Sequence, residues 1–248
     1  MNRQIIAQRP DKTIYRDGDK LIKLFGGNYS QSDILNEAIN QARVAETGLN
    51  VPKFHEVTVI EGKSAIVMDY IEGATYAELI MRYPEKRTEL LREFVAIQRD
   101  VHARKHLLLT KYIDKLKMKI LSSELDASTR YDLSLRLDGM RRHTHLLHGD
   151  FLPSNVILTR GGTPYVVDWS HASQGNASAD ATKSYLLFRL FGNDSFAEEY
   201  IDEFCLQMGV TREYIAEWVP LIAAAQVPKT TDPERKRKLL CWTYEEEA

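Results

Sequence analysis

The apolar residues of this chain change their spacing near residue 70, and this change constrains the fold more than any other feature of the sequence. Before residue 70, short apolar runs alternate with polar residues and are separated by Asp-Gly and Glu-Gly turns, a pattern typical of antiparallel strands. Alternation puts Lys23 on the same face of its strand as two apolar residues. The lysine is either an edge-strand residue that discourages aggregation or part of a site. The expected strands are residues 13–16, 20–25, 53–59 and 64–70.

Helical spacing dominates the rest of the chain, and one helix is expected earlier, at residues 32–47. Glu37 lies beside the apolar stripe of that early helix, so it should face the body of the protein. We therefore predict an α+β fold of two unlike lobes, residues 1–70 and residues 71–248, with a cleft between them. The later helices are expected at residues 85–104, 111–121, 128–142, 180–191, 195–208 and 211–225.

A short segment in the helical part carries the side chains with the clearest chemistry. His148-Gly-Asp150 is followed by Asn155, and Val-Val-Asp168-Trp comes soon after. Carboxylate and amide oxygens are the ligands that Mg²⁺ prefers, so Asn155 and Asp168 are candidate metal ligands and Asp150 is a candidate proton acceptor. The apolar runs 156–159 and 165–167, separated by Gly-Gly, predict a hairpin that holds Asn155 and Asp168 at one site. This set of groups is suited to phosphoryl transfer.

Composition excludes several other classes of protein. The formal net charge is −2, from 33 Lys and Arg against 35 Asp and Glu, and the basic residues are scattered, so we expect no nucleic-acid partner. No apolar run is long enough to cross a membrane. Cys205 and Cys241 lack the spacing of a metal site, and reduced thiols in a cytoplasmic protein are the expectation.

The ordered set Lys23, Glu37, Asp150, Asn155 and Asp168 resembles the aminoglycoside phosphotransferase and choline kinase-like family, over nearly the whole chain. His-Gly-Asp and Asp-Trp are forms that this family often uses where protein kinases carry His-Arg-Asp and Asp-Phe-Gly. The resemblance implies a protein-kinase-like fold, with a small antiparallel-sheet N-terminal lobe with one main helix and a larger, mainly helical C-terminal lobe.

The resemblance also implies roles for residues that the motif alone does not assign. Lys23 would contact the α and β phosphates of ATP or GTP, and Glu37 would orient its ammonium group. The Asp69 carbonyl and the Ile71 amide would pair with the adenine edge. Asp180 would brace the catalytic loop, although a simple helix cap explains it equally well. His148 is expected to be a structural hydrogen-bonding residue of the loop.

We expect a Mg²⁺-dependent kinase that phosphorylates a hydroxyl of a small molecule, such as an aminoglycoside, an amino sugar or an amino alcohol, and that is a monomer or weak homodimer. Residues 7–12, expected to be a loop, contain no glycine where a phosphate-covering flap would lie, so a non-catalytic nucleotide-binding module is the alternative. A protein-kinase activity is a weaker option, because no Ala-Pro-Glu follows Asp168. The acidic run between Asp194 and Glu203 is either a solvated helix face or, as often in this family, part of a pocket for cationic acceptors.

Overall fold

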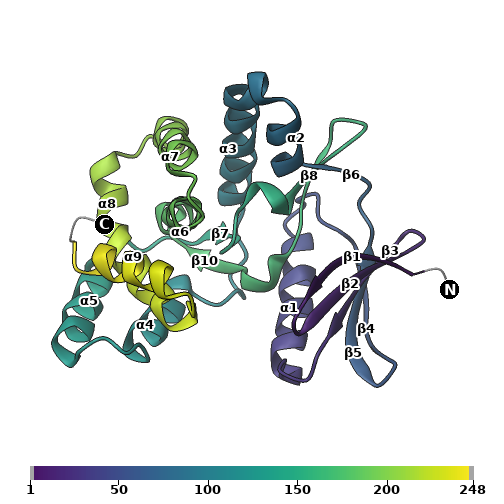
Figure 1. The fold of residues 1–248 in the computed structure, drawn as a ribbon, viewed down its shortest axis with the longest axis horizontal. Coiled ribbons are helices and arrows are strands. Elements are labelled where there is room, and N and C mark those ends of the chain that lie inside the picture. Colours follow the sequence, from purple (N-terminus) through teal and green to yellow (C-terminus); the bar gives the residue numbers. More distant parts are fainter. Residues whose placement is uncertain (1–2, 246–248) are drawn as a thin grey trace. The chain divides into compact units, whose positions relative to one another are not determined.

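The structure is a computed structural model that describes residues 3–245, and these residues form two compact units (Figure 1). The first unit comprises Met1–Pro84 and Pro153–Ala172, and the second comprises Glu85–Leu152 and Ser173–Ala248. The segment 153–172 thus groups with the N-terminal residues although it follows much of the helical part in sequence. The continuous lobes 1–70 and 71–248 stay a prediction.

The first unit contains a five-stranded antiparallel sheet in the order β1-β2-β3-β5-β4. β3 is therefore a central strand, and the interpretation of Lys23 as an edge-strand residue was wrong. The expected loop at residues 7–12 was also wrong, because strand β1 runs into a short turn at Pro10-Asp11 and β2 begins directly after it. The strands are β1 (Gln4–Arg9), β2 (Lys12–Asp17), β3 (Lys20–Phe25), β4 (Phe54–Ile60) and β5 (Lys63–Asp69).

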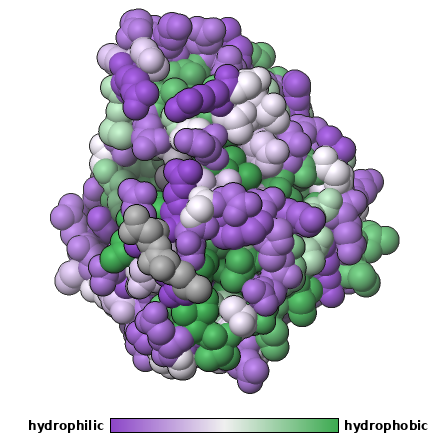
Figure 2. Space-filling model, turned by 90° about the vertical axis from the view of Figure 1, so that its right-hand side faces the viewer, coloured by the Kyte–Doolittle hydropathy of each residue, from purple (hydrophilic) through white to green (hydrophobic). Residues whose placement is uncertain are grey.

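Helix α1 (Gln31–Ala45), which was predicted at residues 32–47, packs against one face of this sheet. Ser30 caps the helix by accepting a hydrogen bond from the Asp33 N–H. A core cluster joins the helix to the sheet and fixes the rotation of α1, which turns Glu37 inward. Its buried members are Phe25, Ile34, Ala38, Ile66 and Met68. Viewed from the side of the sheet, the surface is mostly hydrophilic with hydrophobic residues between the polar ones (Figure 2).

A smaller three-stranded sheet completes the first unit, in the order β6-β8-β9. Val156 pairs with Val166, which confirms the predicted hairpin. Gly73 is required where β6 pairs with β8, since a Cβ atom there would lie 2.4 Å from the carbonyl oxygen of Leu158. The elements are β6 (Gly73–Thr75), α2 (Tyr76–Arg82), β8 (Val156–Thr159) and β9 (Pro164–Val166), with 3₁₀ turns at Pro153–Asn155 and Trp169–His171.

The second unit is mainly helical, and each helix predicted for it is present with small differences at the ends. Helix α6 is buried along nearly all of its length and packs against α7 and α8, while α4 and α9 also pack against α8. The helices are α3 (Arg87–Ala103), α4 (Tyr112–Leu121), α5 (Ala127–Gly139), α6 (Ala177–Leu190), α7 (Asp194–Met208), α8 (Arg212–Gln226) and α9 (Pro233–Thr243), with a 3₁₀ turn at Val227–Lys229. Two short strands, β7 (His145–Leu147) and β10 (Ser173–Gly175), pair antiparallel. Within residues 3–245, no helix has the length and apolar character needed to span a membrane.

Candidate active site

Lys23, Glu37 and Asp168 meet in the first unit. The Lys23 ammonium group donates to Glu37 Oε1 at 2.6 Å and to Asp168 Oδ1 at 2.8 Å, and Lys23 is only 5% exposed. Burial alone would lower the pKa of Lys23, but the carboxylates of Asp168 and Glu37 outweigh it and raise the pKa above its ordinary value. Lys23 therefore stays charged, and a buried cation in this position can bind an anionic ligand.

Lys12 is a fourth member of this group that the sequence reasoning missed. Its ammonium lies 3.2 Å from Glu37 Oε2, and its side chain is buried. Burial and the charge of Lys23 lower the pKa of Lys12, while Glu37 acts in the opposite direction. The signal was strand alternation, because Lys12 pairs with Phe25 in the sheet and so shares the face of Lys23. Because residues 7–12 were expected to form a loop, strand alternation was not applied to Lys12.

Asn155 and Asp168 lie at the same end of the β8–β9 hairpin. The Val167 N–H donates to the Asn155 carbonyl at 2.9 Å, which ties together the two chain segments that carry these residues. Asp168 has a positive φ of 66°, an uncommon backbone conformation for a residue other than glycine. Such conformations concentrate at functional positions, because the surrounding structure must hold them in place.

Asp69 and Ile71 lie where β5 ends. The Asp69 N–H donates to the Lys53 carbonyl at 2.9 Å, and the Tyr70 N–H donates to the Asp19 carbonyl at 2.8 Å. These bonds fix the backbone just before Ile71. The Asp69 carboxylate contacts His55 and Lys20, and the hydrogen bond with His55 is the main cause of its lowered pKa.

Asp150 belongs to the second unit, in a loop that a buried network holds. The fully buried Asp180 accepts hydrogen bonds from the backbone N–H groups of His148 at 3.1 Å and Gly149 at 2.8 Å, and its carboxylate lies 3.0 Å from His102 Nε2. Asn176, not Asp180, caps α6. Of the two roles considered for Asp180, the structure therefore supports the brace.

Two further contacts fix Asp150 itself. The Asp150 N–H donates to His148 Nδ1 at 3.2 Å, which supports the structural role expected for that histidine. The Lys183 ammonium lies 3.5 Å from Asp150 Oδ1 and donates to the Gly149 carbonyl. Lys183 was not foreseen, although it follows Asp180 by three residues on α6 and so lies on the same face of that helix. The Asp150 side chain is 33% exposed and thus accessible to a small molecule.

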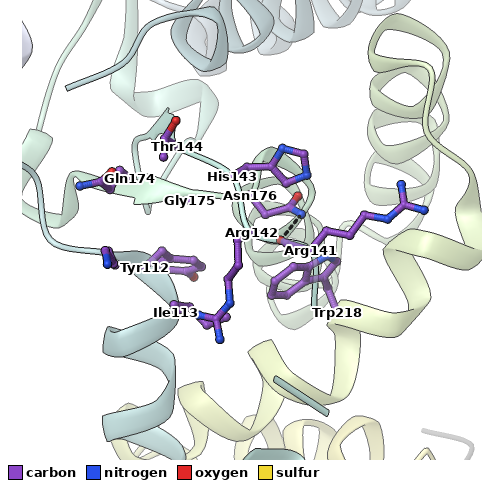
Figure 3. Close-up of a pocket in the computed structure, with 11 residues that line it drawn as sticks. Tyr112, Ile113, Arg141, Arg142, His143, Thr144, Gln174, Gly175, Asn176 and Trp218 are labelled. Atoms are coloured by element: carbon purple, nitrogen blue, oxygen red, sulfur yellow. Dashed lines mark hydrogen bonds between the residues drawn. The ribbon is translucent and has the colours of Figure 1, made fainter. Parts of the chain in front are cut away.

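Each carboxylate of the acidic run on α7 is paired with an arginine, and two of them share Arg212. The pairs are Asp194 with Arg189, Glu198 and Asp202 with Arg212, Glu199 with Arg87, and Glu203 with Arg92. A cavity of about 360 Å³ in the second unit is instead bordered by basic groups, Lys111, Arg141 and Arg142. Figure 3 shows Arg142 projecting between Tyr112 and Trp218.

The sequence of the chain matches the model of the phosphotransferase enzyme family over residues 11–218. No curated protein matched the sequence. Among solved structures, choline kinase LicA from Streptococcus pneumoniae is 15% identical, with a TM-score of 0.67 over 99% of this chain and 94% of that one. A choline/ethanolamine kinase family protein from Mesorhizobium loti is 17% identical, with a TM-score of 0.63 over 98% and 88% of the chains.

A thermostable mutant of aminoglycoside phosphotransferase APH(4)-Ia, solved in a ternary complex with ADP and hygromycin B, has 14% identity and a TM-score of 0.72 over 98% of this chain and 92% of that one. These structures confirm the kinase-like fold, with its antiparallel-sheet N-terminal region and helical C-terminal part. The protein thus has the fold of small-molecule kinases. Since the family model covers most of its length, the chain belongs to the phosphotransferase enzyme family.

Proposed function

We propose that the protein is a Mg²⁺-dependent kinase that transfers the terminal phosphate of ATP or GTP to a hydroxyl of a small molecule. The observation that carries the proposal is the buried group of Lys23, Glu37 and Asp168. Burying charged groups is costly, and an ion pair at such a position often reflects function more than stability. Neighbours of the same fold have been solved with AMP, and with ADP and hygromycin B, which supports a nucleotide donor.

In this proposal the first unit holds the donor. Lys23 binds donor phosphates, and Glu37 orients the Lys23 ammonium group. The Asp69 carbonyl and the Ile71 amide pair with the base, where the backbone is fixed at the end of β5.

The oxygens of Asn155 and Asp168 suit Mg²⁺, which takes one or two protein carboxylates and completes its shell with phosphate oxygens and water. Residues 3–245 contain no cluster of three or more acidic, histidine or cysteine side chains that could hold a metal alone. When bound, Mg²⁺ would neutralise charge on the transferred phosphate.

Asp150 is the proposed catalytic residue. Its carboxylate accepts the proton of the acceptor hydroxyl while that oxygen forms a bond to the terminal phosphorus. The bond from phosphorus to the bridging oxygen breaks, and the nucleoside diphosphate leaves. Asp180 holds the loop and so positions Asp150. Contact with Lys183 fixes the orientation of the carboxylate.

The test is formation of ADP from Mg-ATP with a panel of small hydroxylated acceptors, together with a nucleotide thermal shift. We expect Asp150→Asn to lower the acceptor-dependent rate by about 10² to 10⁴. The control Asp132→Asn removes an exposed carboxylate from α5 and should leave the rate unchanged. A nucleotide thermal shift without transfer to any acceptor would favour the non-catalytic module, which the glycine-free Pro10-Asp11 turn motivates. Absence of both signals would exclude both interpretations.

A further inference from the structure

The second unit contains a group of four lysines, one of which contacts Asp150. Lys183 on α6 is 8% exposed and contacts Asp150 directly. Lys115 and Lys119 are four residues apart on α4, so they share one face of that helix. Lys229 ends the turn that follows α8, and both α4 and α6 pack against α8. Helix packing therefore brings three separate segments together near the proposed catalytic loop.

The packing of α4, α6 and the turn after α8 against α8 places these lysines where each affects the pKa of others. Burial, then the charges of Lys183 and Lys229, lower the pKa of Lys115 to about 8. Burial and three neighbouring lysines lower the pKa of Lys119 to about 7. Lys229 is exposed, and its pKa is also lowered, by desolvation and by Lys183, while Asp150 acts in the opposite direction. Lys115, Lys119 and Lys229 thus lie in the field of Lys183, and Lys115 and Lys119 also lie in the field of Lys229.

Three of these lysines, Lys119, Lys183 and Lys229, face little negative charge. In the part of the chain that the structure describes, Asp150 is the acidic residue that acts on Lys183 and on Lys229, and the charged groups acting on Lys119 are other lysines. Like charges at a spacing of four residues destabilise a helix. A bound anion would remove this cost, whereas a cationic acceptor would be repelled.

We infer that the acceptor of this phosphotransferase is an anion, a small molecule whose carboxylate or phosphate group binds to Lys119, Lys183 and Lys229 while its hydroxyl lies at Asp150. The inference rests on the proposed function and narrows its substrate class. The acids on α7 do not offset the lysines, because arginines already pair with them. The acceptor class differs from the amino sugars and amino alcohols that the family resemblance suggested.

The test is a thermal-shift titration of the whole protein at pH 7 with glycerol 3-phosphate, glycerate, glycerol and choline, at matched ionic strength. Each compound is added with and without Mg²⁺ and a non-hydrolysable ATP analogue. We expect stabilisation by glycerol 3-phosphate or by glycerate, and the stronger of the two identifies the preferred anionic group. Stabilisation by neither anion, or stronger stabilisation by choline, overturns the inference.

Variants of Lys119 and Lys229 test whether the anion binds to these lysines. The double variant Lys119→Gln/Lys229→Gln should raise the apparent Kd of the better anion by roughly tenfold or more, since hydrogen bonds to charged groups are strong. Lys119→Arg keeps the charge and should keep the binding. Lys117→Gln is the matched control, because this lysine is on the same helix and pairs with Asp138. The inference is contradicted if Lys117→Gln weakens anion binding as much as the double variant does. It is also contradicted if the double variant weakens only nucleotide binding.

The two proposals fail in different ways. A protein that gives no thermal shift with the nucleotide analogue contradicts the proposed kinase function, whatever the anions do. A protein that binds the nucleotide but does not distinguish glycerol 3-phosphate and glycerate from choline contradicts only the inferred acceptor class.

Discussion

Replacing Asp180 by asparagine removes one acceptor atom and the negative charge from the centre of the catalytic-loop network. Asp180 Oδ2 faces the His148 N–H and His102 Nε2, and Oδ1 faces the Gly149 N–H. An asparagine has one acceptor oxygen, so at best it keeps the two partners of Oδ2. Its amide NH₂ then faces the Gly149 N–H, which is left without an acceptor in a buried site.

The expected cost follows from this geometry. A buried donor without a partner costs about 1–3 kcal/mol, and the remaining bonds lose the additional strength that a charged acceptor gives them. We therefore expect Asp180→Asn to lower the free energy of unfolding by about 2–4 kcal/mol. Because Gly149 directly precedes Asp150, the acceptor-dependent kcat should fall as well, with little change in the KM for nucleotide.

The assay is urea unfolding combined with steady-state kinetics. Asp126→Ala is the matched control, since Asp126 caps α5 at the surface and its loss should cost about 1 kcal/mol. The pKa of Asp180 is lowered: burial acts against this, but the hydrogen bond and charge of His102 outweigh it. The stability that Asp180 adds is therefore present above the unfolded-state pKa and is lost as the pH falls toward the folded-state pKa. Asp180→Asn should lack this loss, and a variant no less stable than Asp126→Ala would refute the argument.

Two further changes test other parts of the structure. Glu37→Gln leaves the ammonium groups of Lys12 and Lys23 with Asp168 as their remaining described carboxylate. It should therefore lower the free energy of unfolding, measured in urea, by about 3–5 kcal/mol. An unchanged unfolding midpoint would contradict the ion-pair argument. With a permanently charged anionic acceptor, kcat/KM should decline as the pH rises through about 7 to 8, where Lys119 and Lys115 lose their protons. Lys119→Arg stays charged and should reduce this decline, which a pH profile of both proteins would show.

The buried group of Lys23, Glu37 and Asp168 shows which features local sequence patterns can predict and which they cannot. Alternation along 20–25 identified the face of the strand, and the helical spacing of 32–47 turned Glu37 inward, because both periods follow from backbone geometry. Neither pattern could show that β3 is a central strand. Strand order depends on pairing between segments far apart in the chain, and a local window does not contain that information.

Lys12 and Lys183 were missed for related reasons. Lys12 was assigned to a loop, and the strand that precedes it in the structure, β1, is exposed at most of its positions. Lys183 gains its significance only from contact with Asp150, which lies 33 residues away in sequence. The roles of both lysines depend on tertiary contacts.

By itself, the sequence determined the spacing of the strands and helices, the hairpin at 156–167 and the polar groups from Asp150 to Asp168, because backbone periodicity and short motifs are local properties. Only the tertiary structure decided that Asp180 braces the loop, that the acids of α7 pair with arginines and that Lys183 and Lys229, from α6 and from the turn after α8, act on Asp150. The physical reason is that a charge acts through space, so its effect depends on which distant segments the packing brings near it.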